Sequence, residues 1–430
     1  GDLTSQWKKN FSQLEWHISV PPNSRAIVHF PNNSSRINEG GKPIEQVEGI
    51  RQPNVKNPNI WEIGSGEYTF SVDLNVGKGE WKEGIVEEEF LYEKAPFPEC
   101  HAATIAETPK GLVAAFFGGT KERNPDCVIW ICRKTDKGWT APQEVANGVI
   151  NDTLRKACWN PVLYQIPNGE LLLFYKVGNS VSDWTGHLVR SYDNGITWTK
   201  PENLPDGYIG PSKNKPIMIG KKLICPSSLE GSPGWRIHFE ITENNGRSWR
   251  RIGPINDVQN IQAIQPTILS YKNGSLQVLC RTKNRALGES WSMDKGETWS
   301  EMILGTMPNN NSGIDAVTLR DGRQLLVYNH VKPPEGLAKG ARTPLNVSLS
   351  NDGKTWYASL ILEDSPISQY SYPSVIQGKD GFVHVVYTWR RQRIKYMKID
   401  PRKLTVVEIK DEMWPATKIM SIPKKIDMRK

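Results

Sequence analysis

The chain has 430 residues, enough for two or three domains or for one large β architecture with an appendage. Its net charge of +8 comes from 54 Lys and Arg against 46 Asp and Glu spread along the chain, which is mild evidence for an anionic partner. No apolar run approaches the length of a membrane span, and six Cys without a CxxC pair or a Cys/His cluster exclude a disulfide scaffold and a structural zinc site. The 16 Trp, 36 Gly and 30 Pro favour many short strands over a helical bundle.

The N-terminal segment alternates apolar and polar residues in short stretches divided by Pro and Gly turns, which predicts a small β-sandwich. The alternating stretches are residues 14–20, 25–30 and 68–72. A linker is expected at residues 77–84, which hold three Gly and little apolar content. The predicted organisation is therefore a β-sandwich over residues 1–75, a second domain over residues 80–412 and a C-terminal tail over residues 413–430.

A turn motif recurs through the second domain at steps of about 50 residues. In this motif Asp or Asn binds its own backbone, Gly takes a positive φ and Trp opens the following strand. The copies lie at residues 191–198, 242–249, 292–299 and 350–356, with a degenerate copy at 136–139. Since the step equals the length of one propeller blade, the repeat predicts an all-β propeller.

A second series places an apolar strand upstream of each turn motif, and its six starts imply six blades. The six first residues are His101, Asn160, Lys215, Gln265, Asp315 and Tyr372. None is apolar, although strands buried between blades would favour Val or Ile. Because the innermost strands of a propeller begin beside its funnel, these side chains are expected to converge on one site there; the alternative is a hydrated channel that any polar residues fill. The strand that closes the ring is expected from residues 87–92, ahead of the first blade.

The turn motifs resemble the Asp-box, or BNR, repeats of sialidase-like propellers. Sialidases hold the substrate carboxylate with three arginines, use a Tyr nucleophile activated by a Glu, and have an Asp acid/base on a mobile loop. In this sequence Arg281 and Arg342 match the second and third arginines, Tyr372 falls at the nucleophile and Asp126 at the acid/base. The resemblance thus implies that Asp126, Tyr372 and His101 carry the chemistry. The sugar would be held by Arg281, Arg342, Asn160, Lys215, Gln265 and Asp315.

Two positions depart from the sialidase pattern. His101 stands where the first arginine belongs, and Gln265 lies near the position of the Tyr-activating Glu. Losing one guanidinium weakens the case for sialic acid itself, and losing the Glu removes the base that makes a phenol nucleophilic. The resemblance therefore implies a divergent enzyme whose substrate is another acidic sugar.

Structural roles compete with these assignments. Asp126 could cap a turn, Tyr372 could be a buried phenol, and Arg281 and Arg342 could pair with Glu289 or Asp315. Of Arg390, Arg391 and Arg393, which alternate strand faces, only one or two are expected to face the funnel.

A further resemblance concerns the N-terminal segment. Residues 39–44 and 62–70 resemble the C-terminal β-sandwich of bacterial α-L-rhamnosidases. The catalytic (α/α) barrel of those enzymes is absent here, so rhamnosidase chemistry is not carried over. The resemblance implies that the chain belongs to, or descends from, a larger polysaccharide-degrading protein.

The leading hypothesis is an exo-acting glycoside hydrolase of sialidase type that cleaves a carboxylate-bearing sugar from a glycan or plant polysaccharide. One alternative is a polysaccharide lyase acting on a uronate, such as a rhamnose-glucuronate linkage, with Tyr372 and His101 abstracting the proton. Another is a non-catalytic glycan-binding propeller. The expected partner is a glycan, without a metal, cofactor or nucleic acid, because no phosphate loop, dinucleotide fingerprint or nucleic-acid module is present. The charged N-terminus carries no secretory h-region, so a periplasmic or secreted protein would have lost its signal.

Overall fold

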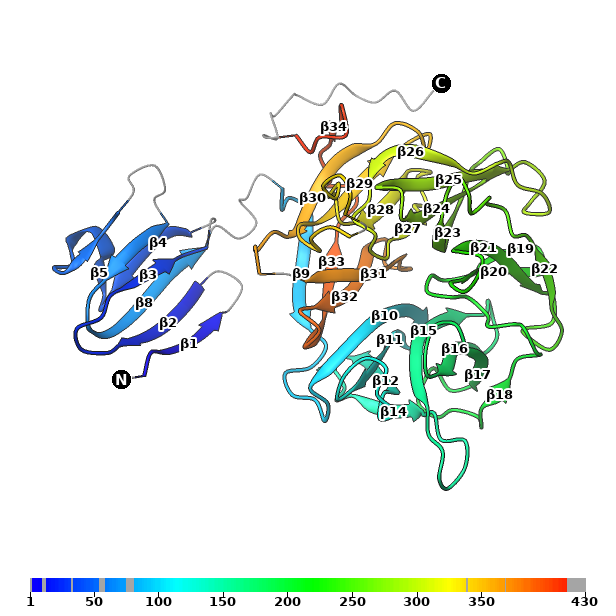
Figure 1. Ribbon diagram of the computed structural model, residues 1–430, viewed down its shortest axis with the longest axis horizontal. Coiled ribbons are helices and arrows are strands. Elements are labelled where there is room, and N and C mark those ends of the chain that lie inside the picture. The colour runs from blue at the N-terminus through cyan, green and yellow to red at the C-terminus, as the bar shows by residue number, and fades with distance from the viewer. Residues whose placement is uncertain are drawn as a thin grey trace. The chain divides into compact units, whose positions relative to one another are not determined.

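The computed structural model describes residues 2–9, 13–31, 34–53, 59–74, 81–337, 339–367 and 369–415. The chain divides into two compact units, residues 1–83 and residues 84–430. Both are built from antiparallel strands, which confirms the predicted all-β class (Figure 1). In the described part of the chain no helix is long and apolar enough to cross a membrane. The predicted linker and C-terminal tail fall largely outside the described residues.

The N-terminal unit is a sandwich of two sheets. The first has the order β1-β2-β8-β4-β5 and the second β3-β7-β6. The strands are β1 (Thr4–Lys9), β2 (Gln13–Val20), β3 (Ala26–His29), β4 (Ser34–Glu39), β5 (Lys42–Pro43), β6 (Ile50–Arg51), β7 (Ile60–Ile63) and β8 (Gly66–Leu74). Leu14 and Phe70 of the first sheet pack against Val28 and Trp61 of the second, so one apolar core joins the two layers.

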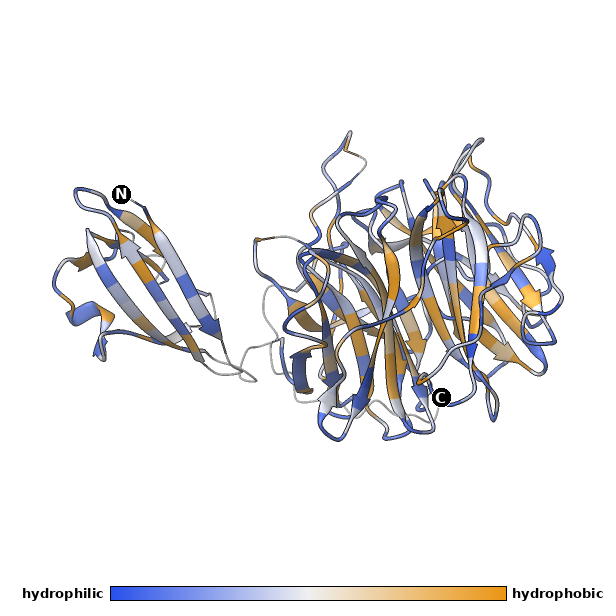
Figure 2. Cartoon of the chain, turned by 90° about the horizontal axis from the view of Figure 1, so that it is seen from below, coloured by the Kyte–Doolittle hydropathy of each residue, from blue (hydrophilic) through white to orange (hydrophobic). Residues whose placement is uncertain are grey.

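The second unit consists of six sheets arranged as blades around an axis (Figure 1). The first three blades are β10 (Glu99–Thr108), β11 (Gly111–Gly119), β12 (Val128–Thr135), β13 (Gly138–Trp139) and β14 (Gln143–Ala146); β15 (Ala157–Gln165), β16 (Leu171–Gly178), β17 (Thr185–Ser191) and β18 (Glu202–Asn203); and β19 (Ile217–Ile219), β20 (Lys222–Leu229), β21 (Arg236–Thr242) and β22 (Arg250–Ile252). Apolar residues are concentrated along the strands and hydrophilic ones at the loops (Figure 2), as expected for sheets buried against neighbouring blades.

The remaining three blades complete the ring. They are β23 (Ala263–Ser270), β24 (Leu276–Thr282), β25 (Ala286–Ser292) and β26 (Ile303–Pro308); β27 (Asp315–Thr318), β28 (Gln324–Tyr328), β29 (Leu345–Ser350), β30 (Tyr357–Glu363) and β34 (Val407–Glu408); and β31 (Tyr370–Gln377), β32 (Val383–Trp389), β33 (Arg393–Ile399) and β9 (Ile85–Phe90). The outer strand of the sixth blade is thus β9, from the start of the unit, which pairs antiparallel with β33. The ring closes between these two strands, as the sequence predicts, and the pairing covers the edge that β33 would otherwise expose.

The Asp-boxes connect the third and fourth strands of their blades. In the fourth blade Asp294 Oδ1 accepts hydrogen bonds from the backbone amides of Glu297 and Thr298, at 3.1 and 2.9 Å. The ring of Trp299 stacks on Phe239 of the third blade, with centroids 4.3 Å apart. Because third strands run in the same direction as first strands, these turns lie at the opposite end of the sheets from the starts of the innermost strands. The Asp-boxes therefore hold the blades together and do not line the funnel site.

The innermost strands begin close to the predicted residues. Five of the six lie within two residues of a strand start, and Asn160 lies three residues inside β15. In four blades the strand register breaks at this point, and one residue takes a positive φ: Ala102, Asn160, Gln265 and Tyr372, at 56°, 29°, 54° and 54°. Such bulges redirect a side chain out of the strand's alternation. They also correct the predicted alignment, because Ala102 rather than His101 is the equivalent of Tyr372.

Candidate functional site

The site is built around Tyr372, at the bulge of β31. Two kinds of loop reach it: those that join second to third strands and those that lead from one blade into the next. Both lie at the end of the sheets where the innermost strands begin, because neighbouring strands are antiparallel. Tyr372 is 9% exposed, and its hydroxyl is bound by residues of the fourth blade.

Arg281 of β24 is buried, and its guanidinium donates hydrogen bonds to uncharged side chains. Its Nη1 donates to Tyr372 Oη at 2.6 Å and to Gln265 Oε1 at 3.1 Å, and its Nε donates to Asn311 Oδ1 at 3.1 Å. The ring of Trp235 lies 5.2 Å from the guanidinium carbon. The guanidinium is therefore fixed in place while its positive charge has no bonded carboxylate.

Arg342 belongs to the loop between β28 and β29 and also has neutral partners. Its Nη1 donates to Gln369 Oε1 at 2.7 Å and to Ser371 Oγ at 3.4 Å. The guanidinium carbon lies 5.5 Å from the centroid of the Tyr372 ring. Burial, together with the positive charges of Arg281 and Arg391, lowers the pKa of Arg342 to about 10. This environment favours a bound anion.

The carboxylates that the sequence offered as structural partners of these arginines are engaged elsewhere. Glu289 accepts a hydrogen bond from Gln277 Nε2, and Asp315 forms an ion pair with Lys215. The predicted alternative, in which Glu289 or Asp315 neutralises Arg281 and Arg342, is therefore wrong.

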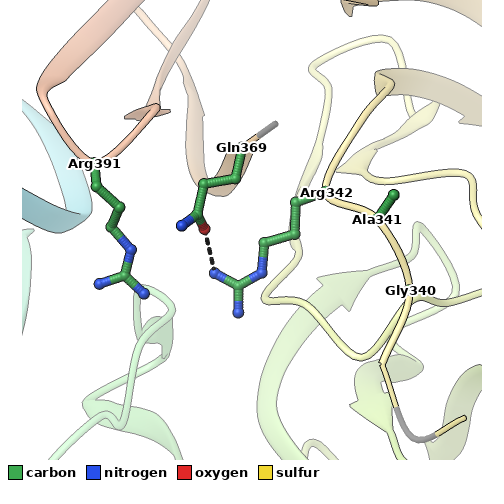
Figure 3. A pocket seen from close by; sticks show the side chains of 5 residues that line it. All are labelled: Gly340, Ala341, Arg342, Gln369 and Arg391. Carbon is green, nitrogen blue, oxygen red and sulfur yellow. Dashed lines mark hydrogen bonds between the residues drawn. The ribbon is translucent and has the colours of Figure 1, made fainter. Parts of the chain in front are cut away.

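Arg391 adds a third guanidinium; the sequence placed it in a group with Arg390 and Arg393, of which only one or two were expected to face the funnel. It lines an open pocket of about 380 Å³ with Gly340, Ala341, Arg342 and Gln369. Figure 3 shows the guanidinium groups of Arg342 and Arg391 on either side of the Gln369 amide. Arg391 lies in the turn between β32 and β33 and forms an ion pair with Glu122.

Face alternation could not identify Arg391, for a conformational reason. Arg390 and Arg391 both have positive φ, 53° and 62°, so the turn does not follow the alternation of a strand. The signal that could have found it is the arginine-rich turn itself, placed at the end of the sheet where the other site residues lie.

His101 packs against the central tyrosine with the two ring planes tilted by 45°. Its ring centroid lies 4.1 Å from that of Tyr372, and its Nδ1 is 2.9 Å from Thr388 Oγ1. Burial, and the positive charges of Arg391 and Arg342, lower the pKa of His101 well below its usual value near 6.5. The imidazole is neutral and does not replace a guanidinium as a carboxylate-binding cation.

Gln265 occupies the place beside Tyr372 that a catalytic base would need. Its Nε2 lies 3.3 Å from Tyr372 Oη and donates to it, while its Oε1 accepts from Arg281. The tyrosine oxygen thus accepts two hydrogen bonds, and neither donor is a base.

Asp126 is exposed and acts as a turn cap. Its Oδ2 accepts hydrogen bonds from both the amide and the hydroxyl of Thr120. The same loop, residues 120–127, directs Glu122 to Arg391. The loop therefore reaches the pocket through Glu122.

The remaining predicted contacts to the sugar join blades to one another. Lys215 Nζ lies 2.9 Å from Asp315 Oδ2, and that carboxylate is fully buried. Asn160 Nδ2 donates to the carbonyl of Ser212 at 3.1 Å. Lys213, which follows Ser212 in the chain, donates to the carbonyls of Ile314 and Pro373. The segment around Lys213 thus connects the third blade to the fifth and sixth. The polar groups of Asn160, Lys215 and Asp315 bind other residues of the propeller in this packing.

Comparison with known proteins places this geometry in a family. A family model described as a BNR repeat-like domain matches residues 110–385. The chain belongs to the BNR repeat-like family. The N-terminal residues 1–45 of this BNR-family chain match the bacterial α-L-rhamnosidase C-terminal domain. Both resemblances seen in the sequence are confirmed.

Individual relatives of the BNR-family chain are distant. An anhydrosialidase of Macrobdella decora is 25% identical over 253 residues, which cover 52% of this chain and 32% of that protein. The chain thus spans about a third of the length of this relative. Solved structures with the same fold include an intramolecular trans-sialidase of Ruminococcus gnavus (TM-score 0.58, 14% identity, 76% of this chain and 98% of that chain), a sialidase of Streptococcus pneumoniae (0.60, 12%, 93% and 86%) and a Dyadobacter fermentans protein of unknown function (0.59, 17%, 74% and 98%).

Proposed function

We propose that this chain is a carbohydrate-active enzyme whose funnel binds a terminal sugar through its carboxylate. The main supporting observation is that buried Arg281 and half-buried Arg342 have neutral hydrogen-bond partners, and that Arg391 lines one pocket with Arg342. Taking a guanidinium out of water costs free energy that a bound anion offsets. Three planar guanidinium groups fit a carboxylate better than a neutral hydroxyl-rich face, because each presents paired donors.

The reaction proposed first is hydrolysis of the sialidase type. The family and the solved structures of sialidases support this class, and Tyr372 supports it by its place beside Arg281 and Arg342. With the sugar carboxylate held by the guanidinium groups, Tyr372 Oη would act on the anomeric carbon as nucleophile or as stabiliser of an oxocarbenium-like centre. A carboxyl of the loop 120–127 would protonate the leaving oxygen.

One observation favours a second reaction, lyase cleavage of a uronate. The uncharged ring of His101 packs with its centroid 4.1 Å from that of Tyr372, so an imidazole and a phenol lie together in the site. In this reaction a base removes the C5 proton, the bond from C4 to the leaving oxygen breaks, and a C4–C5 double bond forms. The arginines would make that proton acidic by neutralising the uronate.

A glycan panel distinguishes these functions. Sialosides, deaminated sialosides and rhamnose-glucuronate disaccharides are incubated with the protein, and both released sugar and ultraviolet absorbance are recorded. Hydrolysis releases sugar without absorbance, whereas a lyase product absorbs through its double bond. Binding of an acidic sugar that Tyr372→Phe leaves unchanged, with no turnover by either protein, would identify a glycan-binding module. Equal binding of neutral and acidic sugars would overturn the carboxylate assignment.

A further inference from the structure

Glu122 is a carboxylate that already binds Arg391, where the carboxylate of a sugar is proposed to bind. It forms an ion pair with Arg391, and the two side chains are 32% and 21% exposed. Its negative charge also acts on Arg342 and opposes the lowering of that residue's pKa. Glu122 therefore lies at the pocket where a ligand's carboxylate would bind, and solvent reaches it.

Few other carboxyl groups are placed to exchange a proton with a sugar bound there. Asp126 is held by Thr120, and the recorded partners of the Tyr372 hydroxyl are Arg281 and Gln265. Glu230 directly follows β20; burial raises its pKa, the charges of Arg281 and Lys283 oppose that rise, and the charge of Glu122 adds to it. Among the described residues we therefore consider Glu122 and Glu230, and of these Glu122 forms an ion pair with Arg391.

Charge balance decides what happens to Glu122 when a ligand binds. Arg391 Nη1 donates to Glu122 Oε2, so a ligand carboxylate that takes this donor displaces Glu122. The groups that then face Glu122 are the ligand anion, Arg342, Glu230 and Cys127, whose thiol stays neutral because burial raises its pKa to about 12. A carboxylate that loses its cation beside another anion binds a proton.

We propose that Glu122 is the catalytic carboxyl that carries the proton in this site, and that a ligand carboxylate releases it by replacing it on Arg391. This rests on the proposed function, since it requires an acidic sugar. In hydrolysis Glu122 gives its proton to the glycosidic oxygen as the bond from that oxygen to the anomeric carbon breaks, and the bonding electrons remain on the departing alcohol. The glycosyl centre, held by Tyr372, is then attacked by water, whose proton returns to Glu122.

Proton uptake on binding tests the proposal without requiring turnover. Two probes, 2,3-unsaturated sialic acid and methyl α-D-glucuronide, are titrated calorimetrically in two buffers of different ionisation enthalpy between pH 6 and 8. We expect the protein to take up as much as one proton per ligand, and its affinity to fall about tenfold per pH unit where uptake is complete. Glu122→Gln is expected to abolish the uptake and to bind at least about tenfold more tightly at pH 8, because nothing competes for Arg391.

Matched variants separate this role from a structural one. Glu93→Gln removes another Arg–Glu ion pair, with Arg393, away from the pocket lining, and should keep the wild-type uptake. Glu122→Asp keeps a carboxyl and should retain part of the pH dependence, and melting temperatures show whether each variant folds. On the sugar that the panel identifies, Glu122→Gln should lower kcat by at least about 100-fold for an alcohol leaving group, and by less for the methylumbelliferyl glycoside.

The outcomes separate the two levels of inference. If neither probe binds and no panel sugar is turned over, the proposed function fails. If a probe binds but uptake persists in Glu122→Gln, or is lost only in Glu230→Gln, the function stands and the assignment of Glu122 is wrong.

Discussion

At the scale of single residues, the site differs from its surroundings in how charge is compensated. Lys215 has its counter-ion in Asp315, and Arg393 has Glu93, whereas Arg281 and Arg342 have amide, hydroxyl and phenol oxygens. Arg281 and Arg342 therefore have no carboxylate hydrogen-bonded to their guanidinium groups, which marks a place where an anion from outside is expected.

Replacing either arginine by lysine tests that interpretation. Arg281→Lys and Arg342→Lys remove the planar donor pair while keeping a positive charge, and each should weaken binding of an acidic sugar by roughly 1.5–3 kcal/mol. Because no bonded carboxylate is orphaned, the melting temperature should change little. Arg323→Lys, in an ion pair with Asp321 outside the pocket, provides the control. A large loss of stability with unchanged binding would instead identify Arg281 and Arg342 as structural.

The buried neutral imidazole of His101 has a consequence for stability. Its folded-state pKa lies well below the unfolded value near 6.5, so below that pH the unfolded chain binds a proton that the folded chain does not. The free energy of unfolding contributed by His101 is complete above about pH 6.5 and declines as the pH falls, by up to about 1.4 kcal/mol per unit. Urea unfolding of wild type and His101→Gln at pH 7.5, 6.5 and 5.5 should give a flatter dependence for the variant. Identical slopes would mean that His101 is protonated in the folded protein.

At the scale of elements, the strands and turns that repeat could be predicted from the sequence. The turns that occur only once could not be predicted. The Asp-box repeat allowed the blades to be predicted because a Gly, a Trp and an Asp or Asn acceptor recur in its copies. The polar residues at the starts of the innermost strands recur with a similar period, and they include Gln265 and Tyr372. The predicted alignment of His101 with Tyr372 was wrong by one residue, because a bulge adds a residue to the strand without any change in composition. Arg391 and Glu122 lie in unrepeated turns, and no periodic pattern identifies them.

The Asp-box supplies its own control for a stability test. In the third blade Asn244 takes the place of Asp294, and its Oδ1 accepts from the amides of Arg247 and Ser248 at 3.1 and 2.8 Å. A charge is therefore dispensable at this position, while an acceptor is not. Asp294→Ala should lower the melting temperature by roughly 2 °C or more, and Asp294→Asn by clearly less. Equal effects in calorimetry would contradict the role assigned to the acceptor.

At the scale of the whole molecule, closure of the propeller depends on a strand that directly follows the N-terminal unit. β9 pairs with β33, and its glutamates bind lysines of two blades: Glu88 binds Lys395 of β33, and Glu87 and Glu89 bind Lys134 of β12 in the first blade. The nearly buried ammonium of Lys395 is also bound by Glu363 at 2.6 Å. The last blade therefore needs residues from the start of the second unit, but none of these contacts comes from the first.

Two deletions that differ by a few residues test this division. A chain that lacks residues 1–83 keeps β9 and should unfold cooperatively with a propeller melting temperature close to that of the full chain, because the sandwich has its own core. A chain that lacks residues 1–91 loses β9, leaves the β33 edge open and removes one of the two carboxylates of Lys395. It should lose at least about 3 kcal/mol of stability or aggregate through the open edge. Calorimetry and light scattering on both proteins measure the difference. Aggregation of the chain that begins at Gly84 would show that the propeller depends on the sandwich, and equal stability of the two deletions would show that β9 does not close the ring.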